Sequence, residues 1–337
     1  MTDTATTLPT PARPKRTPTL PTLPALPGPV RATLRLHRSA LWFWLLLVAV
    51  GAAATLWMYG WGTDAAYTEF VRRGCADAVT GDSCHFGGPA ADRYGTAEDI
   101  SGGLINFVPL LAALWAGASL IGRELENGTA QLAWTQSVSP ARWLAAKLAV
   151  PAVLLTAGTG FLALLHHLAW GAHAELFRGR GPRQWEESGN YVANGPLVPA
   201  YALLGLTVGA LLGLLVRRSM AALGTAFFTF MTLDFAVTSL RPYLWPVKTL
   251  TSDNGYPAYI GMVVDDGALT STGKHVSDPI CGDGAQCLAH YDIVGYYRDY
   301  HPSSHFWPLQ LMETGIVLTL TAAATAAAFW LLRRRTA

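Results

Sequence analysis

Six long apolar runs, separated by polar segments, dominate the pattern of hydrophobic and polar residues in this chain of 337 residues. Apolar runs of about 18 or more residues are typical of membrane spans, because a helix needs about 20 residues to cross a hydrocarbon core of roughly 30 Å. A helix also satisfies its own backbone hydrogen bonds, which lipid cannot do. The pattern therefore predicts an all-α polytopic membrane protein with six transmembrane helices. The predicted spans are 41–59, 104–121, 144–170, 197–216, 220–240 and 309–332.

Composition agrees with a membrane protein, and the basic residues indicate its orientation. Only 14% of the residues are charged, against roughly 25% in ordinary soluble domains. If the N-terminus is cytoplasmic, the inside segments carry 14 of the 24 Lys and Arg residues and only three acids. This excess is the positive-inside signal, so we expect cytoplasmic termini and a multi-pass protein of the plasma membrane. The inside segments are then 1–40, 122–147, 217–218 and 333–337, and the extracytoplasmic loops are 61–103, 171–196 and 241–308.

Two segments precede the first span. Residues 1–29 are rich in Pro and Thr and have no apolar period, which predicts a disordered Pro-rich cytoplasmic tail ahead of a six-span domain at 30–337. Residues 30–40 alternate apolar and basic side chains at nearly helical spacing. We expect them to form an amphipathic lead-in helix on the inner membrane surface. The long loop 241–308 has room for short helices packed on the outer mouth.

All four cysteines fall in loops that this topology places outside. Disulfides persist on the oxidising side of a membrane, and short loops are easily closed by them. We expect the pairs Cys75–Cys84 and Cys281–Cys287. Four unpaired thiols are the alternative.

A compact polar segment, GRELENGTAQLAWTQSVSPARWLAAKL, separates the second and third spans. Its sequence predicts a short helix, a bend at Asn127-Gly128, and a third span that begins at Pro140 after a Ser139 N-cap. Arg142 and Lys147 can reach the headgroups from that span. The result is a rigid polar elbow at 122–143, suited to docking a cytoplasmic partner. A solvated loop with helix-stabilising charges is the alternative.

The run G-R-E-x-E-N-G-T-x-x-L-x-x-T-Q-S-V-S-x-x-R-W-L-x-x-K-L resembles the signature between spans two and three of type-2 ABC exporter permeases. In that family this segment holds the coupling helix, and six spans, cytoplasmic ends, a lead-in helix and a large outer segment before span six agree with it. The sizeable loop before span four is a departure, because it is usually short in relatives. The residues that the resemblance implies for ATPase coupling are Arg123, Glu124, Glu126, Gly128, Thr129 and Arg142.

The resemblance implies the permease subunit of an ATP-driven exporter. Two such subunits, as a homodimer or heterodimer, would pair in the bilayer above a separate ABC ATPase dimer. ATP and Mg would bind to that ATPase, so we expect no cofactor on this chain, no enzymatic activity of its own and no nucleic-acid partner. The alternative is a non-transporting membrane scaffold or immunity protein with the same fold.

The nearest match to a phosphate-binding loop is GALTSTGK at 267–274. It has one residue too many between the glycines, and His275 follows where Ser or Thr is needed. No apolar helix follows it. The match is a chance one.

Three features inside the predicted spans need an interpretation. Asp234 lies within the fifth span, where an acid is costly. It could handle substrate or protons, or pair with Arg241 two helical turns later. Glu313 lies near the outer end of the sixth span, where contact with water would explain it. The fourth span carries Gly205, Gly209 and Gly213 on one face, a spacing that permits close helix packing within the chain or with a second copy.

Histidines raise two further alternatives. His166 and His167 lie toward the outer end of the third span, where interfacial polar residues are the simple interpretation. Haem or copper ligation by them would instead make the chain an intramembrane redox protein. His301 and His305 have a spacing suited to a metal, with Asp299 nearby, but they lack a firm third ligand. We therefore expect no metal site.

Overall fold

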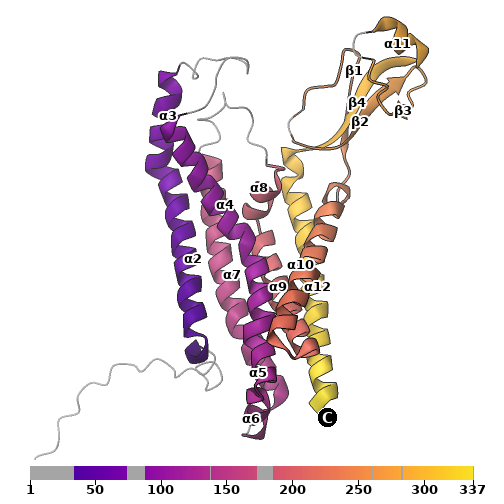
Figure 1. The fold of residues 1–337 in the computed structure, drawn as a ribbon. Coiled ribbons are helices and arrows are strands. Elements are labelled where there is room, and N and C mark those ends of the chain that lie inside the picture. Colours follow the sequence, from indigo (N-terminus) through magenta and orange to yellow (C-terminus); the bar gives the residue numbers. More distant parts are fainter. Residues whose placement is uncertain are drawn as a thin grey trace, which may run out of the picture.

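The computed structural model describes residues 34–73, 88–136, 138–172, 185–259, 261–281 and 284–336. Six helices in this part of the chain are long and apolar enough to cross a membrane (Figure 1), as the sequence predicts. They run over Arg38–Arg72, Pro89–Glu126, Pro140–Gly171, Leu197–Val216, Ser219–Tyr243 and Ser303–Thr336. The predicted tail at 1–29 and the pair Cys75 and Cys84 lie outside the described residues, and of the lead-in segment 30–40 only residues 34–40 are described.

The first two spans extend farther than their apolar runs. The first comprises α2 (Arg38–Trp57), a π-helical turn (Met58–Gly62) and α3 (Thr63–Arg72). The second begins with α4 (Pro89–Trp115), so most of the described part of the expected outer loop 61–103 is helical. The polar residues of this segment therefore belong to α3 and to the first turns of α4. These helical parts continue the two spans beyond their apolar runs.

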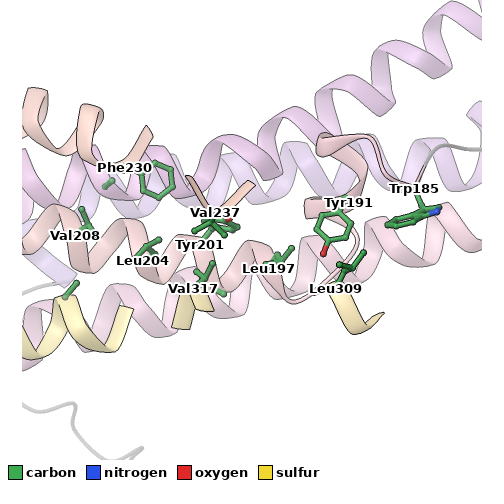
Figure 2. Close-up of a cluster of buried hydrophobic side chains, with 13 residues drawn as sticks. Trp185, Tyr191, Leu197, Tyr201, Leu204, Val208, Phe230, Val237, Leu309 and Val317 are labelled. Atoms are coloured by element: carbon green, nitrogen blue, oxygen red, sulfur yellow. The ribbon is translucent and has the colours of Figure 1, made fainter. Parts of the chain in front are cut away.

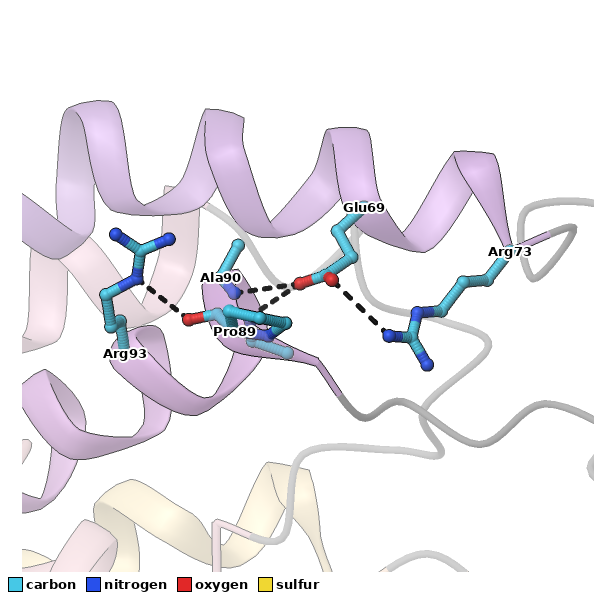
Figure 3. Close-up of polar contacts among 6 residues, drawn as sticks. Glu69, Arg73, Pro89, Ala90 and Arg93 are labelled. Atoms are coloured by element: carbon cyan, nitrogen blue, oxygen red, sulfur yellow. Dashed lines mark hydrogen bonds and ion pairs between the residues drawn. The ribbon is translucent and has the colours of Figure 1, made fainter.

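Glu69 joins the two helical extensions (Figure 3). Its Oε2 accepts hydrogen bonds from the backbone N–H groups of Ala90 and Ala91, at 2.8 and 3.2 Å. These are among the first N–H groups of α4, which have no partner within the helix. Arg73 bonds to the same carboxylate at 3.4 Å. A carboxylate on α3 thus caps α4, which a local capping pattern could not predict.

Helix α9 (Leu197–Val216) forms the centre of the bundle and packs against α4, α7 (Pro140–Ala172), α10 (Ser219–Leu240) and α12 (Phe306–Thr336). Its glycine face meets α4 and the π-helical turn that follows it, Ala116–Gly122. A Cβ on Gly205 would collide with the carbonyl oxygen of Pro109, and one on Gly209 with that of Ala113. The glycines therefore serve close packing within the chain, since any larger residue would separate the two backbones.

Side chains of α9, α10 and α12 make up most of the main buried cluster around α9 (Figure 2), and Ala113 of α4, Trp185 and Tyr191 complete it. Tyr201, Leu204 and Val208 of α9 lie between residues of α10 and α12. In lipid such packing stabilises helices through contact and shape rather than through exclusion of water. The labelled partners on α10 and α12 are Phe230, Val237, Leu309 and Val317.

The segment between α10 and α12 contains a small β-sheet, not the short helices that we expected there. Its order is β1-β4-β2-β3, and every neighbouring pair is antiparallel. One short helix, α11 (Ala285–His290), accompanies the sheet, and a disulfide joins Cys281 to Cys287. The strands are rich in β-branched and aromatic residues, which favour a pleated surface. They are β1 (Lys248–Ser252), β2 (Gly261–Thr270), β3 (His275–Val276) and β4 (Ile293–Pro302).

The sheet lies at one end of the helical bundle, beyond the C-terminal end of α10 and the N-terminal end of α12 (Figure 1). The opposite end carries the start of α2, two short helices after the π-helical turn Ala116–Gly122, and the C-terminal end of α12. We call these the sheet end and the elbow end. The prediction that both termini are cytoplasmic would place the elbow end inside.

Candidate functional site: the helical elbow

The polar segment between the second and third spans forms two short helices, α5 (Arg123–Glu126) and α6 (Thr129–Thr135). Gly128 between them has φ 71°, a left-handed conformation that glycine adopts without steric cost. Helix α7 begins at Pro140, and the Ser139 carbonyl accepts a hydrogen bond from the Trp143 N–H at 3.0 Å. We call residues 123–139 the elbow. Its bend and the start of α7 lie where the sequence predicts them.

One side of the elbow packs tightly on the bundle. Leu125 and Ala130 are buried, and they join a cluster with Trp143, Leu144 and Leu148 of α7. The Trp134 and Trp143 rings meet edge to face, with centroids 5.6 Å apart. Because Leu125 of α5 and Ala130, Ala133 and Trp134 of α6 pack on this cluster, the elbow is held in a fixed orientation and is not a free loop.

Glu124 turns toward the bundle as well. Its carboxylate pairs with the Lys147 ammonium and accepts a hydrogen bond from Trp143 Nε1 at 3.3 Å. Lys147 is 5% exposed, so its predicted reach to the headgroups is wrong. Two charges buried this far need each other, because an unpaired charge in such surroundings is costly.

His37, just before α2, completes this group. Its Nε2 lies 3.3 Å from Lys147 Nζ. Burial, helped by the positive charge of Lys147, lowers the pKa of His37 to about 4. The imidazole is therefore neutral at pH 7 and can accept a hydrogen bond from the ammonium. The result is a chain of contacts from the start of α2 through α7 to the elbow.

Glu126 links the elbow to α10. Its Oε2 accepts hydrogen bonds from the Ser219 N–H at 2.9 Å and from the Ser219 hydroxyl at 2.6 Å. Ser219 is the first residue of α10, where N–H groups lack partners within the helix and a negative charge is favourable. Arg217 has φ 56°, which allows the tight turn from α9 into this contact.

The remaining residues expected to couple to an ATPase have different surroundings. Thr129 donates a hydrogen bond from its hydroxyl to the Glu124 carbonyl at 3.1 Å, while Arg123 and Arg142 are exposed. Leu132 is 58% exposed, so this polar segment presents a large apolar side chain on its surface. The exposed side of the elbow, together with the adjoining start of α7, comprises Arg123, Asn127, Gln131, Leu132, Thr135, Gln136 and Arg142.

Sequence reasoning found the elbow but missed the partners of its acids. His37 and Lys147 are separated by 110 residues, and Glu126 and Ser219 by 93. No local spacing rule joins such residues. The available signal was the presence of two acids, Glu124 and Glu126, in a predicted inside segment where bases dominate, which implied partners without naming them.

A second polar group lies at the sheet end. Arg241 donates to Glu313 through Nε at 2.7 Å and through Nη2 at 3.0 Å, and Tyr201 donates to the same carboxylate at 2.8 Å. Glu313 is completely buried, so the expectation that water explains it is wrong. Among the described residues no ion pair joins Arg241 to Asp234, which corrects that predicted pairing. Asp234 is half-buried.

Three of the four histidines considered above have hydrogen-bond partners within the chain, whereas His167 Nδ1 is buried without one among the described residues. His166 is buried, not interfacial, and its Nδ1 lies 2.8 Å from Asn194 Oδ1. His301 and His305 face each other with their Nδ1 atoms 3.0 Å apart, and His301 Nε2 donates to the Pro242 carbonyl. No group of three His, Cys, Asp or Glu residues among those described could hold a metal ion.

The segment GALTSTGK occupies the end of β2 and the turn into β3. A phosphate-binding loop instead joins a strand to the N-terminus of a helix. The geometry therefore agrees with a chance match.

The fold and elbow thus define a polytopic membrane protein with a rigid polar projection at one end. A family model described as ABC-2 membrane transporter related matches residues 45–241, more than half of the chain. The protein belongs to this family. It is a multi-pass permease component, and its family implies association with an ABC ATPase. The match includes the first five spans and the elbow and ends before the sheet. No curated protein and no solved structure matches the chain.

Proposed function

We propose that this chain is the permease subunit of an ATP-driven exporter in the plasma membrane. Both termini and the elbow face the cytoplasm, a second permease subunit pairs with the chain, and the elbow docks on a separate ATPase that binds ATP and Mg. The observation that carries the proposal is the two-sided elbow. Leu125 and Ala130 fix it to the bundle, while Leu132 and Arg123 are left on its exposed side.

Leu132, an exposed leucine with polar and basic neighbours, is the kind of surface that binds in a groove of a partner protein. Apolar contact would anchor the elbow, and Arg123 and Arg142 would steer and orient it toward an acidic rim. Glu124 and Glu126, in contrast, have partners within the chain. In this proposal they transmit force and do not contact the ATPase.

The partners of Glu124 and Glu126 indicate which helices would receive movement of the elbow. Glu124 connects the elbow to α7 through Lys147, and Glu126 connects it to α10 through Ser219. When ATP closes the ATPase dimer, movement of the elbow would tilt both helices together. ATP can shift the permease only if the closed ATPase binds one permease state better than the other. Because the elbow is rigidly attached to α7 and α10, it moves with these helices, and its position would therefore differ between the two permease states.

A pull-down from native membranes in mild detergent tests the proposal. The tagged wild-type chain should recover a soluble ATPase in stoichiometric amounts, and Leu132→Asp and Arg123→Glu should lose most of it. Ile280→Asp is the matched control, because Ile280 is 89% exposed at the sheet end. It should retain the ATPase.

Failure of the wild-type chain to recover an ATPase in several detergents would contradict the docking proposal. Recovery of an ATPase whose hydrolysis drives no efflux from proteoliposomes would favour a non-transporting scaffold instead. Equal loss in all variants would indicate that the effect is not specific to the elbow.

A further inference from the structure

A cavity of about 580 Å³ lies among α2, the second span and α7, toward the elbow end. Leu41, Phe43 and Leu47 line it from α2, and Leu154 and Leu155 line it from α7. Other apolar side chains from the second span complete the wall, including Val108, Leu111, Ala112, Leu114, Trp115 and Ala118. A hydrocarbon chain fits such a lining, whereas a polar solute would lose its hydrogen bonds there.

The few polar groups of the cavity come from the ends of the spans, not their middles. His37 directly precedes the first span and Ser39 lies at its start, whereas Ser119 lies near the end of the second span. Phe43 is 58% exposed and Leu223 of α10 is also exposed, so the cavity borders the lipid-facing surface. An occupant can therefore enter sideways from the bilayer with its polar part at the elbow end.

Positive charge surrounds this polar part. Arg35 and Arg38 flank His37 at the start of α2, and both are exposed. Basic residues near a membrane surface attract anionic lipid headgroups. We propose that the cavity binds one acyl chain of an anionic phospholipid from the leaflet at the elbow end, with the phosphate held by Arg35 and Arg38.

The site is in contact with the elbow network. The His37 ring meets Trp115, a wall residue, edge to face with centroids 5.3 Å apart. The same His37 contacts Lys147, the partner of Glu124. A bound acyl chain holds Trp115 and His37 in place, so the lipid positions the network that fixes the elbow. This consequence for coupling rests on the proposed docking function, whereas lipid binding itself does not.

Photolabelling of the purified full-length chain tests the site. The probe is phosphatidylglycerol with a diazirine in its acyl chain, presented at low mole fraction in nanodiscs of phosphatidylcholine. Peptides from α2 and α7 that line the cavity should carry most of the label. Unlabelled phosphatidylglycerol should compete better than phosphatidylcholine of the same chain length, by about fivefold for each arginine that contacts the phosphate.

Two matched substitutions make the test specific. Ala118→Phe places a ring in the cavity and should remove most of the cavity label. Val153→Phe adds the same ring on the same bundle, at a residue that is 68% exposed and does not line the cavity, and should leave the label unchanged. Arg35→Gln with Arg38→Gln should remove the preference for phosphatidylglycerol and retain acyl-chain labelling. Monodisperse elution of each variant checks folding.

Label spread evenly over the lipid-facing sides of α10 and α12, or a cavity label that survives Ala118→Phe, would overturn the proposal. Equal competition by both lipids would overturn the assignment of the phosphate to the two arginines. The readout needs neither an ATPase nor a transported substrate. Its result is therefore independent of the exporter proposal.

Discussion

Arg241 and Glu313 form a two-bond ion pair that joins the sheet-end terminus of the fifth span to the beginning of the sixth. The guanidinium is 3% exposed and the carboxylate 0%, and the Tyr191 ring lies 4.2 Å from the guanidinium carbon. Tyr201 of α9 donates to the same carboxylate. Three spans therefore meet at a single carboxylate, and the segment before α9 contacts its arginine partner.

Removal of one partner of the Arg241–Glu313 pair should destabilise the protein more than removal of both. Glu313→Gln leaves a buried guanidinium without its counter-charge, and it should lower the free energy of unfolding by about 3 to 5 kcal/mol. The double variant Glu313→Gln with Arg241→Met should recover part of this loss. Thermal unfolding in detergent measures both. A double variant less stable than either single variant would contradict the account.

Neutralising Glu124 should uncouple the elbow without preventing membrane insertion. Glu124→Gln leaves the Lys147 ammonium buried beside a neutral His37, and Glu124→Arg adds repulsion. We expect transport to fall at least tenfold, since a local loss of about 1.4 kcal/mol already changes a population tenfold. Transport by proteoliposomes measures it, and Ile280→Asp, an exposed position at the sheet end, is the control. Full transport by Glu124→Arg would eliminate Glu124 from coupling.

Glycines that touch a neighbouring backbone should not tolerate a side chain. Gly209→Leu forces α9 away from Ala113, and we expect the free energy of unfolding to fall by about 1 to 3 kcal/mol. Gly224→Ala in α10 is the matched control, because a Cβ there meets no atom within 4 Å. It should be neutral or slightly stabilising, since alanine is the better helix former. Melting temperatures of the two variants test the contrast.

His37 should make the protein less stable in mild acid. In the unfolded chain this histidine binds a proton near the ordinary histidine pKa of 6.5, whereas in the folded protein its pKa is lowered to about 4. The unfolded state therefore binds more protons in this interval, and stability falls as the pH drops through it. We expect a loss of about 1 to 2 kcal/mol at pH 5 relative to pH 7.5. In His37→Gln the pH dependence of the melting temperature should be smaller.

The disulfide between Cys281 and Cys287 should resist alkylation until the protein is reduced. Mass spectrometry of unreduced protein should find the two peptides linked. We also expect linked peptides containing Cys75 and Cys84, a pairing that remains a prediction. Removal of Cys281 and Cys287 together should cost about 2 kcal/mol, because a short loop constrains the unfolded chain only modestly. Free Cys281 in native membranes would contradict an oxidising location for the sheet.

The spans and the elbow were predictable because their signals are local. Length and apolarity define a membrane helix, and Gly128, Ser139 and Pro140 mark turns and helix starts through their own backbone preferences. The partners of Glu313, Glu124 and Glu126 were not predictable, because each lies many residues away and depends on how helices pack. The sheet was missed although strand signals were present, including the tyrosines of β4 and the β-branched residues of β2.

The close approach of α9 to α4 also limits how the protein can move. Where Gly205 and Gly209 meet the carbonyl groups of Pro109 and Ala113, the two backbones leave no room to slide or rotate past each other. In the proposed transport cycle these two spans would therefore move as one rigid body. The first, fifth and sixth spans are the least enclosed, since only 17%, 22% and 22% of their span windows are buried. Two of these spans, the first and the fifth, are linked to the elbow through His37 and Ser219, so in the proposed transport cycle the elbow would act on two of the least enclosed spans.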